Sequence, residues 1–174
     1  MINIIERFYN ASKYFCDYLT NSTLDETNIS ELMSLLLNLY SLGLELPDVE
    51  PDTIDSCYED NEENFICKLQ KMEIKFSDYY LTMFDPYKED KPIMGSLYDD
   101  LFDIARDLKD GIQEYEKGSL NNAVFEWRFG LNEHWGRHLL GALSALHSLR
   151  REYEYEKLCL EAANTDTSNK VTAE

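Results

Sequence analysis

Two histidines four residues apart have the clearest capacity for chemistry in this chain. His134 and His138 lie on one face if their segment is helical, because residues four apart stand one turn above each other. An imidazole pair at this spacing, facing carboxylates on a neighbouring helix, is how metal sites are built in helical bundles. Such carboxylates occur earlier in the chain, at Asp100, Asp103 and Asp107.

A short turn joins the acidic segment to the histidine segment. Gly118 is expected to end one helix and Ser119 to cap the next, so the two helices form an antiparallel hairpin. Centring the turn between these residues gives the level pairs, which are Asp100 with Arg137, Asp103 with His134, and Asp107 with Gly130. The hairpin therefore predicts an acidic strip that faces a strip of histidine and arginine.

Two interpretations of this constellation stay open. In the first, it is a metal or small-ligand site with Arg137 as the holder of an anion, and the metal candidates are His134, His138 and Asp103. In the second, it is a structural network in which histidine and arginine neutralise half-buried carboxylates. The candidates for either role are His134, His138, Arg137, Asp100, Asp103, Trp127 and Trp135.

No catalytic motif stands beside these residues. The string from His134 to His138 lacks the glutamate of the H-E-x-x-H metalloprotease motif, because Trp135 occupies that position. His147 is expected on the opposite helix face and cannot join the pair without a bend. Neither a nucleophile triad nor a phosphate-binding glycine loop can be argued from spacing. We therefore assign no catalytic residue, expect no cofactor, and favour a protein that is not an enzyme.

Apolar periodicity predicts an all-α fold in one domain. Stripes at helical spacing indicate helices over residues 3–19, 30–44, 62–83 and 96–117, and we expect no strands. The segment 119–151 is apolar nearly all round, which is typical of a buried helix, so it is expected to be the long central helix of a five-helix bundle, either straight or kinked near Gly130 or Gly136. The expected domain is 1–160, with an acidic connector at 45–64 and a disordered polar tail at 161–174.

The charge of the chain excludes several classes of partner. With 34 acidic and 16 basic residues, its formal net charge is −18, which disfavours binding to nucleic acid or anionic membranes. Four cysteines without metal-finger spacing indicate a reducing compartment, and no apolar segment is long enough to span a bilayer. We expect a cytoplasmic protein whose acidic surface is available to a protein partner. Its oligomeric state is not indicated.

Several strings resemble an uncharacterised family, the domain of unknown function 5063. They are WRFGL at 127–131, HWGRHL at 134–139, LPDVEP at 46–51 and LYDDL at 97–101. The resemblance implies a cytosolic bacterial all-helical domain, and it supplies no activity, substrate or cofactor. Our first functional hypothesis is a non-enzymatic acidic interaction module. The second is a metal- or small-ligand-binding protein, either a binder or an enzyme, with its site at the helical hairpin.

Overall fold

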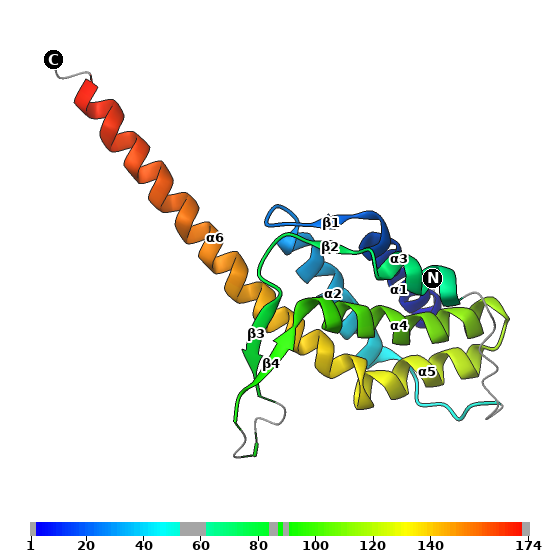
Figure 1. Cartoon of the computed structure of the whole chain (residues 1–174). Coiled ribbons are helices and arrows are strands. Elements are labelled where there is room, and N and C mark those ends of the chain that lie inside the picture. Colours follow the sequence, from blue (N-terminus) through cyan, green and yellow to red (C-terminus); the bar gives the residue numbers. More distant parts are fainter. Residues whose placement is uncertain (1–2, 53–61, 84–86, 89–90, 172–174) are drawn as a thin grey trace.

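A computed structural model describes the whole chain except residues 1–2, 53–61, 84–86, 89–90 and 172–174 (Figure 1). Its helices are α1 (Ile4–Asn21), α2 (Ile29–Glu45), α3 (Glu62–Leu69), α4 (Leu97–Glu116), α5 (Leu120–Glu133) and α6 (Trp135–Val171). Its strands are β1 (Thr23–Leu24), β2 (Glu73–Ile74), β3 (Tyr79–Thr82) and β4 (Ile93–Ser96). The expected all-α bundle is confirmed, with small strand pieces added to it.

The core lies between α1, α2, α4, α5 and the first half of α6, which pack against one another (Figure 1). The apolar stripe that the sequence places on α4 is buried, and it consists of Leu97, Leu101, Ile104, Leu108 and Ile112. Burying one such side chain contributes about 1.5–3 kcal/mol to folding. On α1, Phe8 contacts the rings of both Trp127 and Trp135, with centroids 5.0 and 6.2 Å away.

The expected long central helix is wrong in one respect, because it is two helices that meet at His134. That residue has φ −141° and ψ −80°, outside the helical region. In one straight helix, Trp127 and Trp135 would stand about 12 Å apart along the axis. The break instead brings the Trp135 indole back so that its N–H donates to the Trp127 carbonyl at 3.0 Å. Both rings then share the pocket around Phe8.

The expected third helix over 62–83 is also wrong, since α3 ends at Leu69 and strands follow it. β2 pairs in parallel with β1, and β3 pairs with β4 as an antiparallel hairpin. The residues from Tyr79 to Thr82 alternate between exposed and half-buried, which is the period of a strand. Aromatic and β-branched residues favour that conformation. Spacings of three and four between Phe76, Tyr79, Tyr80 and Met83 match a helix equally well, which misled the sequence prediction.

α6 runs far beyond the bundle, as its projecting C-terminal half shows (Figure 1). It is helical to Val171, where a disordered tail from residue 161 was expected. The proposed domain boundary at residue 160 stays a prediction. Part of the acidic connector, residues 53–61, lies outside the described residues. Among the helices that the structure describes, none combines the length and apolar character that crossing a membrane requires.

Candidate functional site

Two caps fix the start of α4 and hence the position of its acidic face. Ser96 is the cap residue of α4, and its hydroxyl accepts a hydrogen bond from the Asp99 amide at 3.0 Å. Asp78, which precedes β3, accepts from the Tyr98 amide at 2.7 Å and from the Ser96 hydroxyl at 3.1 Å. Carboxylates are stabilised at a helix N-terminus by its unpaired amides and its dipole. Asp78 therefore ties the hairpin β3–β4 to α4.

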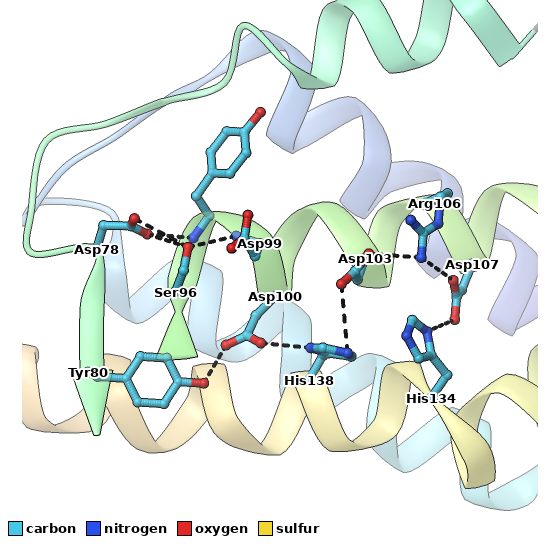
Figure 2. A network of polar contacts seen from close by, with 11 residues as sticks. Asp78, Tyr80, Ser96, Asp99, Asp100, Asp103, Arg106, Asp107, His134 and His138 are labelled. Carbon is cyan, nitrogen blue, oxygen red and sulfur yellow. Dashed lines mark hydrogen bonds and ion pairs between the residues drawn. The ribbon is translucent and has the colours of Figure 1, made fainter. Parts of the chain in front are cut away.

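His138, on the first turn of α6, lies between two carboxylates of α4 (Figure 2). Its Nδ1 is 2.8 Å from Asp100 Oδ1, and its Nε2 is 3.7 Å from Asp103 Oδ2. Because an ionised carboxylate can only accept, Nδ1 carries a proton and donates it to Asp100. The longer distance exceeds that of a hydrogen bond. The Nε2 atom of His138 thus faces Asp103 across a gap.

His134, at the junction of α5 and α6, is held in the same manner. Its Nδ1 donates to Asp107 Oδ2 at 2.6 Å. Arg106 forms ion pairs with Asp103 at 2.8 Å and with Asp107 at 3.6 Å, so it balances part of the negative charge on α4. The two imidazole rings lie 4.7 Å apart between centroids. Each histidine is therefore oriented by its own carboxylate, through the same ring nitrogen.

Tyr80 on β3 completes the network, and the sequence analysis missed it. Its hydroxyl donates to Asp100 Oδ2, the oxygen that His138 leaves free. Two glycines make room for the phenol, since a Cβ on Gly95 would stand 2.7 Å from the ring and one on Gly141 would stand 2.5 Å from the hydroxyl. The sequence of β3, Tyr-Tyr-Leu-Thr, has no alternation of polar and apolar residues, so it carried no signal of this inward direction.

The facing helices are shifted relative to the predicted register. Asp100 contacts His138, which is one residue beyond its predicted partner Arg137. Asp107 contacts His134, which is four residues beyond its predicted partner Gly130. Asp103 faces His138, which is four residues beyond its predicted partner His134. The non-helical residue at the α5–α6 junction shifts the residues that follow it along α4, relative to their positions in an unbroken helix. The sequence placed His134 and His138 opposite the acidic strip of α4 but paired them with the wrong carboxylates.

The remaining predicted candidates are the two tryptophans and Arg137. The tryptophan candidates are core residues, because Trp127 and Trp135 are fully buried and donate their N–H groups to the carbonyls of Leu108 and Trp127. Arg137 is exposed and lines the pocket beside His138. His147 is exposed further along α6 and does not belong to the cluster.

Asp103, His134 and His138 form the group with the geometry of a metal site among the described residues. One ligand atom from each lies within 4.8 Å of the others, and all three side chains are half-buried. A pocket of about 560 Å³ adjoins them, and Asp103 and His138 form part of its wall. Cavities of this volume are typical of small-molecule sites. The opposite wall comes from the β3–β4 hairpin, including Met83, Ile93 and Met94.

Charge and burial alter the acidity of two groups here. The hydrogen bond to Asp100 raises the pKa of His138, the charges of Asp100 and Asp103 act in the same direction, and burial opposes them. Burial, together with the bond to Asp100, raises the pKa of Tyr80, so its phenol remains a donor at neutral pH. Asp100 is itself buried, and Tyr80 and His138 satisfy both of its oxygens.

Comparisons with known proteins address the fold and the family. The structure is similar to the crystal structure of protein BF1032 from Bacteroides fragilis, with a TM-score of 0.64 and 24% sequence identity over 83% of this chain and 90% of that one. No curated protein matches the chain. The family model for a domain of unknown function, DUF5063, matches residues 2–152. The chain therefore belongs to the DUF5063 family.

Proposed function

We propose that this protein binds a divalent transition-metal ion through His134, His138 and Asp103 and presents it to the adjoining pocket. The observation that carries the proposal is that both histidines donate Nδ1–H to carboxylates, Asp107 and Asp100. In metal sites, this partnership fixes the tautomer and directs the Nε2 lone pair toward the ion. Two imidazoles and one carboxylate are a common ligand set for zinc and for iron.

The distances suit this ligand set. In a tetrahedral zinc site with ligands at about 2.1 Å, neighbouring ligand atoms lie about 3.4 Å apart. The Nε2 of His138 and Oδ2 of Asp103 are 3.7 Å apart, too far for a hydrogen bond and close to the separation that a bridged cation gives. The three ligand atoms lie within 4.8 Å of one another, so binding would require them to approach by at most about 1.4 Å.

Three protein ligands leave at least one coordination position open on a tetrahedral ion. The side chains of His138 and Asp103 also line the pocket, so an ion between them would be accessible to a small molecule there. Arg106 is paired with Asp103 and Asp107 and limits the negative charge at the site. The chemistry that an ion supplies at such a position is polarisation of a bound oxygen.

Metal analysis of untagged protein and zinc titration by calorimetry test the proposal. We expect one zinc ion per chain, and a loss of at least 100-fold in affinity in the double variant His134→Ala, His138→Ala. The matched control is His147→Ala, which removes the exposed third histidine and should leave the affinity within twofold. Equal zinc affinity in the double variant and the control would refute the site. The acidic interaction module would then be the remaining hypothesis.

A further inference from the structure

The two histidines of the proposed metal site are oriented by carboxylates that are themselves held in different ways. The carboxylate that orients His134 belongs to α4, and its second oxygen lies 3.6 Å from Arg106 on the same helix. Asp100, which orients His138, has its second oxygen bonded to the hydroxyl of Tyr80. Figure 2 shows that Tyr80 reaches this oxygen from β3. The orientation of His138 therefore depends on a separate element of the fold.

Asp100 needs both of its hydrogen bonds, because its side chain is only 9% exposed. A buried carboxylate oxygen that loses its donor keeps the cost of leaving water without compensation. Removing the Tyr80 hydroxyl therefore favours rotation of the carboxylate toward another donor. The oxygen that receives the Nδ1–H of His138 rotates with it, so the direction of Nε2 changes.

Two glycines pack closely around the phenol and hold its hydroxyl at Asp100. Gly95 is the cross-strand partner of Tyr80, and an added Cβ there would stand 2.7 Å from Cζ of the ring. Gly141 on α6 lies beside the hydroxyl, and an added Cβ there would stand 2.5 Å from its oxygen. The variant Gly141→Ala would thus displace the hydroxyl from the carboxylate while the tyrosine itself stays in the chain.

We infer that Tyr80 is a positioning residue of the metal site, which acts on the ion through Asp100 and His138 and makes zinc affinity depend on the docking of the β3–β4 hairpin. The inference rests on the proposed metal site. Because coupling between two equilibria is reciprocal, a bound ion should in turn hold the hairpin against α4. The hairpin also lines the pocket, so a movement of Tyr80 alters the pocket and the ion site together.

Zinc calorimetry on Tyr80→Phe tests the inference, with Tyr79→Phe as the matched control because that neighbour is 67% exposed. Tyr80→Phe should weaken zinc binding about tenfold, the lower end of what the outer partners of a metal ligand contribute. Gly141→Ala should also weaken it, although alanine is the better helix former. Tyr79→Phe should leave zinc affinity unchanged.

A double-mutant cycle separates positioning from a general loss of packing. If Tyr80 acts through Asp100, the double variant Tyr80→Phe, Asp100→Ala should bind zinc as Asp100→Ala does, within about twofold, since residues that act as one unit are not additive. Hydrogen exchange gives a readout other than affinity. Zinc should slow exchange of the amides of β3 and β4 in the wild type, and it should do so much less in Tyr80→Phe.

The outcomes keep the two proposals apart. Zinc binding that Tyr80→Phe leaves unchanged would overturn the role of Tyr80 and leave the metal site intact. Equal losses in Tyr80→Phe and Tyr79→Phe, or a loss that adds to that of Asp100→Ala, would overturn positioning through the carboxylate. Failure of the wild type to bind zinc would overturn both proposals. Urea unfolding without zinc establishes that each variant is folded, and Gly141→Ala gives the same decision where Tyr80→Phe is not.

Discussion

His134 is the one residue between α5 and α6, and it donates a hydrogen bond to Asp107 at 2.6 Å. The same break that folds Trp135 back into the core therefore also sets the imidazole against α4. Gly136 permits the break, since a Cβ there would stand 2.1 Å from the carbonyl oxygen of Leu131. Core packing and site geometry thus depend on the same junction.

Replacing Asp107 by asparagine should weaken zinc binding by about 10- to 100-fold, the usual effect of losing a carboxylate that orients a ligating histidine. The variant keeps the shape of the side chain but removes the charge that fixes the His134 tautomer. Calorimetric titration measures the change. The control is Glu133→Gln, which removes an exposed carboxylate next to His134 in sequence. Equal losses in both variants would mean that overall charge, and not orientation, governs affinity.

The variant Gly111→Ala should destabilise the fold by about 2–3 kcal/mol, because overpacking a well-filled core forces its neighbours to move. An added Cβ would stand 2.2 Å from Nε1 of Trp127, which is fully buried and bonded to the Leu108 carbonyl. Urea unfolding gives the free energy, and tryptophan fluorescence reports displacement of the ring.

Gly118→Ala is the comparison for that variant. Gly118 has φ +86° and no atom within 4 Å of an added Cβ, so its cost is backbone strain of about 1–2 kcal/mol. The fluorescence of the folded protein should therefore stay unchanged. A wild-type unfolding curve for Gly111→Ala would show that Trp127 does not pack on this glycine.

Cys16 should resist alkylation in the folded protein. Burial raises the pKa of its thiol to about 12, and the reactive form of cysteine is the thiolate. Cys67 and Cys159 are exposed and should react with iodoacetamide at pH 8. Peptide mass spectrometry before and after denaturation distinguishes the sites. Rapid labelling of Cys16 under native conditions would show that α1 separates readily from α4, where its Sγ contacts the Ala105 carbonyl.

The ion pair of Lys13 with Glu116 should make stability depend on pH in the acid range. The hydrogen bond from Lys13, at 2.7 Å, lowers the pKa of Glu116, and one from Tyr9 adds to it. The unfolded state then binds more protons than the folded state. The stabilisation by the ion pair is therefore complete above the ordinary glutamate pKa, and it is lost as the pH falls through the lower pKa that Glu116 has in the folded state. Since Glu116 is 44% exposed, solvent limits the effect to about 0.5–1 kcal/mol.

Urea unfolding of wild type and Glu116→Gln at pH 7 and at pH 3 measures the contribution of the ion pair to the free energy of unfolding. The variant should be less stable at pH 7, and the difference should narrow at pH 3. Glu6→Gln, an exposed change on α1, controls for total charge. A difference that widens on acidification would contradict the direction of the pKa shift.

Local pattern was sufficient for most of the helices. The apolar stripe of α4 depends on residues within one or two turns of one another, so spacing alone located it. The helix predicted for the region after Leu69 was wrong because the apolar spacing there fits a strand as well as a helix. Pairing with another strand decided between them, as in β1 with β2 and β3 with β4.

The sequence by itself determined the all-helical class, the acidic strip of α4 and the histidine pair. Only the tertiary structure decided that His138 meets Asp100, that His134 meets Asp107, and that Tyr80 joins them. The reason is that periodicity fixes the face of a helix but not its level against a neighbour. That level depends on the break at His134, which the packing of two tryptophans around Phe8 favours and the glycines near it permit.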